Sequence, residues 1–464
     1  ASSGMAMAHW EIQGWMILIL GWVFVPFYSR SMVYTMPEFL ERRYNPQSRT
    51  ILSVISLVSY VLTKVAVTVY AGGLVFQQVF GIKELWGIDF FWIAAIGLVV
   101  LTALYTIFGG MKSVLYTSVL QTPILLLGSL IILVLGFKEL GGWDEMMRVC
   151  GAVTVNDYGD TMTNLIRSND DANFPWLGAL IGSAIIGFWY WCTDQFIVQR
   201  VLSGKNEKEA RRGTIFGAYL KLLPVFLFLI PGMIAFALHQ KYIGAGGEGF
   251  LPMLANGTAN ADAAFPTLVA KLLPAGVKGL VVCGILAALM SSLASLFNSS
   301  AMLFTIDFYK RFRPETPEKK LVGIGQIATV VIVILGILWI PIMRSVGDVL
   351  YTYLQDVQSV LAPGIAAAFL LGICWKRTSA QGGMWGLIAG MIIGLTRLGA
   401  KVYYSNAGEV ADSTFKYLFY DMNWLFFCGW MFLFCIIVVI VVSLATEAPT
   451  AEKIQGLLFG TATK

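Results

Sequence analysis

Residues 277–306 read VKGLVVCGILAALMSSLASLFNSSAMLFTI, an apolar run of 30 residues whose one charged residue, Lys278, lies at its start. A helix of about 20 apolar residues crosses the hydrocarbon core of a bilayer. Strands of a membrane barrel would instead show ten-residue stretches of alternating polarity. This run therefore predicts a transmembrane helix.

The composition extends this prediction to the whole chain. Of 464 residues 57% are hydrophobic and 13% are charged, with a mean hydropathy of +0.74, whereas about 25% of the residues of soluble proteins are charged. Two histidines and six scattered cysteines do not provide a zinc site or a disulfide framework. No nucleophile motif or phosphate-binding loop is present, so we expect no enzyme. The net charge of +5, spread over short loops, predicts no nucleic-acid partner.

Eleven apolar runs predict about eleven transmembrane helices in an all-α polytopic protein. They lie at 12–29, 51–80, 90–108, 113–136, 176–199, 213–238, 277–306, 321–343, 349–374, 380–404 and 419–445. Lysine and arginine concentrate after the first, fifth, seventh and ninth runs, which predicts that these loops are cytoplasmic. The longer segments 137–175 and 240–273 are not basic and are predicted to face outward.

Five charged side chains lie within or beside these runs, where burial in lipid is costly. They are Glu11, Lys64, Asp194, Lys221 and Asp356. Such residues mark a transport pathway by default. The alternative is structural ion pairing, or extension of the side chain toward the membrane surface.

Two polar clusters accompany them. Residues 187–195 read GFWYWCTDQ, which is typical either of an interfacial aromatic belt or of a sugar site, where rings stack on the sugar and polar groups bind its hydroxyls. The hydroxyls of Ser291, Ser292 and Ser295 either bond back along their own helix or bind a sodium ion together with freed carbonyls.

Several motifs resemble the sodium/glucose cotransporters of the sodium:solute symporter family. They are WYWCTDQFIVQR at 189–200, YLKL at 219–222, MSSLAS at 290–295 with Asn298-Ser299, FTID at 304–307, LQ at 354–355 before Pro363-Gly364, TMPEFL at 35–40 and LYT at 115–117. The resemblance covers essentially the whole chain.

The resemblance implies a leucine-transporter-like fold of two inverted five-helix repeats in one transmembrane domain, 1–464. We expect the first repeat over 1–140, an outer loop over 141–175, the second repeat over 176–375, and peripheral helices with a cytoplasmic tail over 376–464. In the family the first core helix is broken and contributes to both sites. Residues 1–8 resemble only its tail, so we expect N-terminal helices to be missing from this sequence.

The resemblance also implies the site residues. The sugar would be held by Glu11, Lys64, Tyr190, Trp191, Lys221 and Gln355, with Trp10, Tyr190 and Tyr351 as gates. Sodium would be held by the Ala288 carbonyl and the Ser291 and Ser292 hydroxyls. Where many relatives have an acidic residue after Tyr-Thr, this chain has Ser118, which favours one sodium per sugar.

The expected function is therefore sodium-coupled symport of a hexose such as glucose or galactose. The alternatives are myo-inositol or another polyol as solute, or a sugar-gated sensor or channel. The expected partners are the sugar, sodium and the lipid bilayer, with no obligatory protein partner. We expect a location in a cell membrane, with the inner membrane of a bacterium favoured over a eukaryotic plasma membrane.

Overall fold

The computed structural model describes residues 2–33, 35–254, 257–346, 349–407, 411–459 and 461, with the side chains of these residues except at 105, 107–115, 117, 120 and 343–346. The chain divides into two compact units that interleave along the sequence. The first comprises Ala1–Glu11, Lys64–Trp176 and Leu222–Asn298, and the second comprises Ile12–Thr63, Leu177–Lys221 and Ser299–Lys464.

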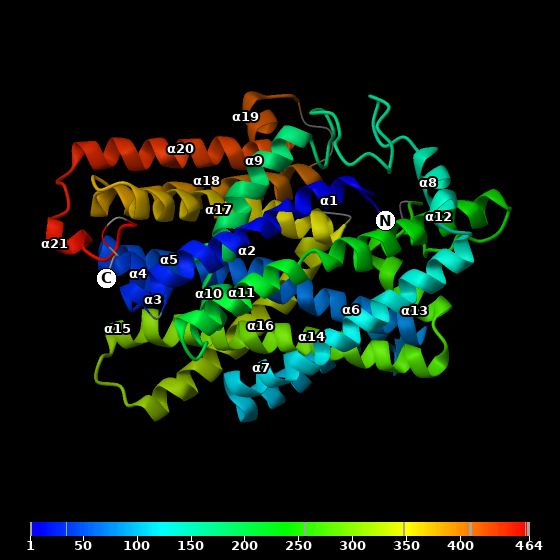
Figure 1. Cartoon of the computed structure of the whole chain (residues 1–464), viewed down its shortest axis with the longest axis horizontal. Coiled ribbons are helices and arrows are strands. Elements are labelled where there is room, and N and C mark those ends of the chain that lie inside the picture. The colour runs from blue at the N-terminus through cyan, green and yellow to red at the C-terminus, as the bar shows by residue number, and fades with distance from the viewer. Residues whose placement is uncertain are drawn as a thin grey trace. The chain divides into compact units, whose positions relative to one another are not determined.

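The first unit is a helical layer with one short antiparallel hairpin. Its elements are α1 (Ala6–Trp10), α6 (Ala66–Phe80), β1 (Glu84–Leu85), β2 (Ile88–Asp89), α7 (Phe90–Leu140), α8 (Trp143–Gly151), η5 (Val225–Leu229), α12 (Ile230–Gly244), η6 (Ala261–Ala263), α13 (Ala264–Leu272) and most of α14 (Ala275–Met302). Helices α6, α7, α12 and α13 pack against one another (Figure 1). Their contact buries an apolar core that includes Ile132, Met233 and Leu268.

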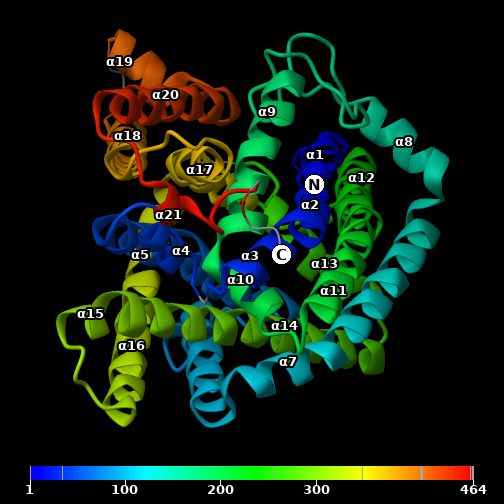
Figure 2. The same ribbon diagram turned by 60° about the vertical axis from the view of Figure 1, so that its left-hand side comes forward.

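The second unit contains the remaining elements, except for a few residues at their ends. These elements are η1 (Glu11–Trp15), α2 (Met16–Ile19), η2 (Leu20–Phe24), α3 (Val25–Ser31), α4 (Met36–Arg43), α5 (Pro46–Ser59), η3 (Tyr60–Val65), α9 (Trp176–Gly187), η4 (Phe188–Thr193), α10 (Gln195–Leu202), α11 (Glu207–Leu220), η7 (Leu303–Tyr309), α15 (Lys310–Phe312), α16 (Glu318–Val346), α17 (Leu350–Cys374), α18 (Ala380–Asn406), α19 (Thr414–Lys416), η8 (Tyr417–Asp421), α20 (Trp424–Ala445) and α21 (Ala451–Ile454). The excepted residues are the first residue of η1, the last two residues of η3 and the first residue of α9, which belong to the first unit. Helices α17, α18 and α20 lie side by side (Figure 2).

Side-chain caps begin several of these helices. Asn45 accepts a hydrogen bond from Ser48 N at the start of α5, and Asn206 accepts one from Glu209 N at the start of α11. Each cap satisfies a backbone donor that has no partner within its helix. Polar residues at these positions therefore fix where the apolar segments begin.

Ten helices among the described residues are long and apolar enough to cross a membrane. They correspond to ten of the eleven predicted runs, and the remaining run, 90–108, corresponds to the shorter apolar segment Phe90–Leu104. The runs 90–108 and 113–136 both fall within α7, whose bounds are Phe90–Leu140. The domain limits expected for the repeats stay a prediction.

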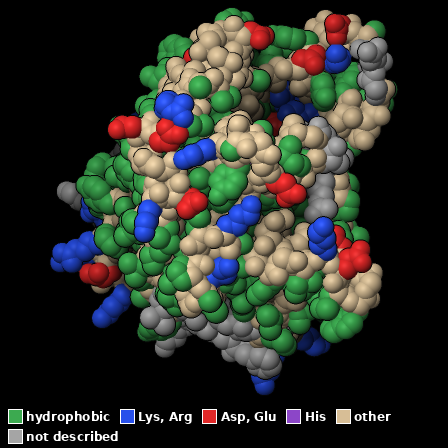
Figure 3. Space-filling model, turned by 90° about the vertical axis from the view of Figure 1, so that its right-hand side faces the viewer, with side chains coloured by type: hydrophobic (Ala, Val, Ile, Leu, Met, Phe, Trp, Pro, Cys, Tyr) green, Lys and Arg blue, Asp and Glu red, His purple; other side chains and the backbone are tan. Residues whose placement is uncertain are grey.

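Charged side chains are scattered over the face that includes α8, α12 and α13 (Figure 3). Acidic and basic groups alternate on it without forming a patch of one sign. Large apolar side chains are exposed on the membrane-length helices instead, for example Val330, Leu338 and Ile437. Exposed apolar residues on such helices are suited to contact with lipid.

Close packing of α17 and α18 depends on two facing glycines. A Cβ atom added to Gly390 would lie 2.6 Å from the Gly364 Cα, so the two backbones meet without side chains between them. Gly399, on the same helix α18, has open space around its Cβ position. Gly390 and Gly399 therefore form a matched pair for substitution, one in close contact and one in open space.

We expect Gly390→Ala to destabilise the protein by about 1–3 kcal/mol, because the added methyl group must push two backbones apart. Gly399→Ala should be neutral or slightly stabilising, since alanine favours a helix by about 1 kcal/mol over glycine. Thermal unfolding of the purified protein in detergent compares the two variants. Equal effects of the two substitutions would contradict the proposed close contact.

Candidate functional site

The span expected at 176–199 is interrupted in the structure. Helix α9 passes into the wider π-helical turn η4, Asp194 is extended with φ −78° and ψ 126°, and α10 begins at Gln195. Broken helices of this kind expose backbone groups inside a membrane transporter. This break is not among the features predicted from the sequence. The feature of the sequence that could have indicated the break is Asp194, because aspartate is a good N-cap residue and the amphipathic segment 195–202 follows it directly.

Buried side chains satisfy the backbone at the break. Asp194 Oδ1 accepts hydrogen bonds from the Phe196 backbone N–H at 3.1 Å and from the Tyr60 hydroxyl at 2.8 Å. The Tyr28 hydroxyl donates to the Cys192 carbonyl at 2.7 Å. Both tyrosines are buried. Asp194 is thus the N-cap of α10 and the hydrogen-bond acceptor of Tyr60.

A second set of bonds fixes the start of α10. Gln195 Oε1 accepts a hydrogen bond from Met36 N at 2.8 Å, which ties α10 to the beginning of α4. Gln195 Nε2 donates to Gln199 Oε1 at 3.3 Å, and the Ser299 hydroxyl donates to the same oxygen at 3.3 Å. The two glutamines thus join segments far apart in the sequence.

The second unit holds four of the residues expected to bind sugar. Tyr190 and Trp191 lie on η4, where their ring centroids are 4.9 Å apart in an edge-to-face arrangement. Gln355 is 5% exposed on α17, one turn after the expected gate residue Tyr351, and α17 packs against η4. The side chain of Lys221, which follows α11, lies against Gly14.

Two of these side chains have buried polar atoms without a hydrogen-bond partner among the described residues. They are the Trp191 indole Nε1 and the Gln355 Oε1, one donor and one acceptor. Such atoms are rare in native interiors, because losing water without a replacement costs about 1–3 kcal/mol. They are therefore suited to a ligand that both donates and accepts hydrogen bonds.

The expected sodium ligands lie on α14 in the first unit. Ala288, Ser291 and Ser292 are spaced i, i+3 and i+4, so they share one face of the helix. The Ser291 hydroxyl is hydrogen-bonded to the Ser118 hydroxyl at 2.6 Å, and the Ser295 hydroxyl donates to the Ser291 carbonyl at 2.9 Å. The structure thus brings Ser118 next to an expected sodium ligand.

The remaining expected residues also belong to the first unit. Trp10, the last residue of α1, is fully buried, and Glu11 directly after it is half-buried. Lys64 is half-buried on η3. The expected sugar residues are therefore divided between the units, with Glu11 and Lys64 in the first and Tyr190, Trp191, Lys221 and Gln355 in the second.

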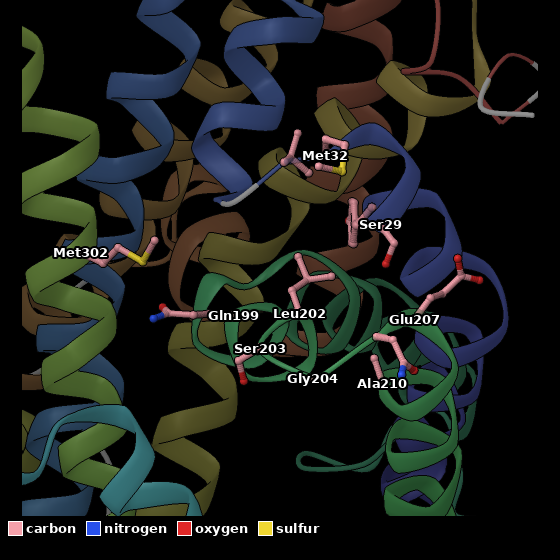
Figure 4. A pocket seen from close by; sticks show the side chains of 12 residues that line it. Ser29, Met32, Gln199, Leu202, Ser203, Gly204, Glu207, Ala210 and Met302 are labelled. Carbon is pink, nitrogen blue, oxygen red and sulfur yellow. The ribbon is translucent and has the colours of Figure 1, made fainter. Parts of the chain in front are cut away.

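A cavity of 360 Å³ in the second unit lies between α3, α10 and α11 (Figure 4). Its polar lining includes Ser29, Gln199, Ser203 and Glu207, and the Tyr28 side chain that holds the helix break also borders it. The basic residues of 205–212 predict that this end of the unit is cytoplasmic.

Comparison of the chain with known proteins identifies its family. A model of the sodium:solute symporter family matches residues 1–390. The chain belongs to the sodium:solute symporter family. Family members are transporters and not enzymes, so the chain is a multi-pass, sodium-coupled solute symporter with sodium as its co-transported ion.

Similar symporters are known from several animals. The chain is 35% identical to the sodium/myo-inositol cotransporter 2 of Homo sapiens, over 99% of this chain and 69% of the relative. It is 37% identical to a sodium/mannose cotransporter of Bos taurus, over 96% and 76%, and 34% identical to the sodium/glucose cotransporter 4 of Danio rerio, over 98% and 70%.

The predicted leucine-transporter-like fold is confirmed. A solved structure of a Na⁺-coupled sialic acid symporter in a substrate-bound, outward-open state matches with a TM-score of 0.70 and 20% identity, over 96% of this chain and 86% of that one. At this identity the likeness concerns the fold alone.

The helix break generates a prediction about this symporter. We expect Asp194→Ala to destabilise it by about 1–3 kcal/mol, because the substitution removes the cap of α10 and the acceptor of the buried Tyr60 hydroxyl. Asp194→Asn keeps an acceptor oxygen and should retain most of the stability. Thermal unfolding in detergent tests this. Tyr60→Phe should lose part of the stability that Asp194→Ala loses, and Tyr403→Phe, at an exposed position, is the control. Equal losses for alanine and asparagine would contradict the capping role.

Proposed function

We propose that this symporter carries a neutral, polyhydroxylated solute, a hexose such as glucose or galactose. The observation that supports this is the pair of unpartnered buried atoms, Gln355 Oε1 and Trp191 Nε1, on elements that pack together. A hydroxyl donates to the first and a hydroxyl oxygen accepts from the second. Neither group carries a charge, so neither favours a carboxylate or an ammonium group.

The other expected residues complete the proposed sugar site. Tyr190 stacks its ring on a C–H face of the sugar and closes the inner gate, while Trp10 and Tyr351 close the outer gate. Glu11 and Lys221 form charge-assisted hydrogen bonds to sugar hydroxyls, which are stronger than neutral ones. Lys64 supplies a further polar contact.

One sodium ion is proposed to accompany each sugar, held by the Ala288 carbonyl and the Ser291 and Ser292 hydroxyls. Sodium favours the outward-open state, sugar closes the outer gate, and loss of sodium inside releases both. One charge crossing 100 mV contributes about 2.3 kcal/mol. A tenfold sodium gradient adds about 1.4 kcal/mol. Together these terms support sugar accumulation of roughly several hundredfold.

A cyclic polyol is the second candidate solute. The relative from Homo sapiens is named a myo-inositol cotransporter, and myo-inositol offers hydroxyls much like those of a hexose. We propose that the protein lies in the inner membrane of a bacterium rather than in a eukaryotic plasma membrane, because its predicted outer segments contain few cysteines.

Tracer uptake into proteoliposomes tests the function. We expect labelled glucose or galactose to accumulate above its outside concentration when an inward sodium gradient is applied, and not with potassium in its place. Accumulation of myo-inositol without accumulation of either hexose would show that the transported solute is a polyol and not a hexose. Sugar-dependent current without accumulation would instead show a sensor or channel and overturn symport.

The solute site has its own test. We expect Gln355→Ala to raise the KM for the solute about tenfold or more, because the variant loses a buried hydrogen-bonding side chain. The control is Gln358→Ala, which removes a buried glutamine on the same helix with no proposed role. Uptake kinetics at saturating sodium give the KM of each variant. An unchanged KM for Gln355→Ala would contradict the assignment of Gln355.

A further inference from the structure

The segment 152–175, between α8 and α9, lies against the residues that lead into α1. Both belong to the first unit. Met5 N donates to the Met162 carbonyl at 2.9 Å. Gly4 has a φ of +57°, and a Cβ atom there would lie 2.1 Å from the Met162 carbonyl oxygen, so only glycine fits this contact. The two segments therefore lie in direct backbone contact.

A buried arginine strengthens this contact. The Arg167 side chain is 1% exposed, and its Nη2 donates to the Ser3 carbonyl at 2.5 Å. Its Nη1 donates to Asp171 Oδ2 at 3.1 Å, and the Asp171 side chain is 3% exposed. A buried ion pair holds its geometry strictly, because either charge left alone is strongly unfavourable. The carbonyl of Ser3 is thus anchored by a cation whose own position is fixed.

Neighbouring residues hold the carboxylate of that pair. Asp171 Oδ1 accepts from Asn173 N at 2.9 Å and from Phe174 N at 2.7 Å. Asn156 Nδ2 donates to Asp171 Oδ2 at 3.3 Å and to Asp160 Oδ2 at 2.8 Å. The bond from Asn156 and one from Ser168 N lower the pKa of Asp160 below its ordinary value, so it is a carboxylate at neutral pH. We call Asn156, Asp160, Arg167 and Asp171 the outer clasp.

The outer clasp holds the start of the helix that ends at the expected gate. Helix α1 begins at Ala6, three residues after the anchored carbonyl, and ends at the fully buried Trp10, with Glu11 next. A helix rises about 1.5 Å per residue, so Glu11 lies only about 10 Å along the axis from Met5. A shift or rotation at residues 3–5 is therefore transmitted to Trp10 and Glu11.

We propose that Arg167 is a positioning residue for the transported solute, which it serves by fixing α1 in the register that presents Glu11. This inference rests on the proposed role of Glu11 in binding sugar. Without the anchor, α1 occupies several positions and only a fraction of the molecules binds solute. Apparent affinity falls in proportion to that fraction. The rate at saturating solute changes little, because solute binding restores the competent position.

Uptake kinetics of the full chain in proteoliposomes test this. We expect Arg167→Gln to raise the KM about five- to tenfold and to keep Vmax within twofold, with Asp171→Asn acting in the same direction. Arg167→Lys keeps the charge but loses the second hydrogen-bonding group of the guanidinium, so its KM should lie between those of Arg167→Gln and the parent. Arg148→Gln removes an exposed arginine of α8 in the same outer segment and should leave both values unchanged.

A double variant separates positioning from general damage. In the Glu11→Gln background, Arg167→Gln should raise the KM much less than it does alone, because the register of α1 then matters less to the solute. Fully multiplicative effects, or an unchanged KM in well-folded Arg167→Gln, would overturn the proposal. Thermal unfolding identifies misfolded variants, and Asp171→Asn then replaces Arg167→Gln in the cycle.

A second measurement does not depend on transport. Amide hydrogen exchange of residues 6–11 should be at least tenfold faster in Arg167→Gln than in the parent, with exchange in α17 unchanged. If the parent accumulates no solute, the proposed function fails. The exchange result still decides whether the outer clasp anchors α1, and equal exchange in parent and variant would overturn it.

Discussion

The hydrogen bonds around Asp194 are the interaction on which the proposed solute site depends. A membrane helix can be broken only where other groups replace the backbone bonds it loses, because lipid offers none. The Asp194 carboxylate caps α10 and accepts a hydrogen bond from the Tyr60 hydroxyl. The Tyr28 hydroxyl donates a hydrogen bond to the Cys192 carbonyl. The break ends α9 and η4 where Tyr190 and Trp191 lie, so the aromatic cluster is at the end of a half-helix.

Two buried or partly buried charged side chains of the second unit have partners within the fold. Arg43 is fully buried and donates to the carbonyls of Gly372, Trp375 and Thr378, which joins the end of α4 to the end of α17. Asp356 forms an ion pair with Lys401. These charges are engaged within the fold. Gln355, the neighbour of Asp356, is neutral, buried and has an oxygen without a partner. The proposed site therefore uses a neutral group whose hydrogen-bonding capacity is not filled within the described chain.

The sequence predicts this fold well because membrane-spanning length is a local property. Ten runs match membrane-length helices of the described chain, and the runs 90–108 and 113–136 both fall within α7. The break at Asp194 and the outer clasp depend on partners far away in the sequence, such as Tyr60 and Ser3. No local pattern identifies those partners. The resemblance supplies the roles of Glu11, Lys64 and Lys221, which stay predictions.

The contact between Ser118 and Ser291 bears on how the proposed sodium ion couples to voltage. With a carboxylate at position 118, the empty site would be negative and the loaded site neutral, so the return of the empty carrier would respond to the membrane potential. Two hydroxyls 2.6 Å apart carry no charge. Sodium then adds a positive charge that no residue of this pair cancels, and the loaded step gains about 2.3 kcal/mol per 100 mV. With Ser118, the voltage-dependent step of the proposed cycle is therefore the movement of the loaded carrier, which transfers the charge of one sodium ion.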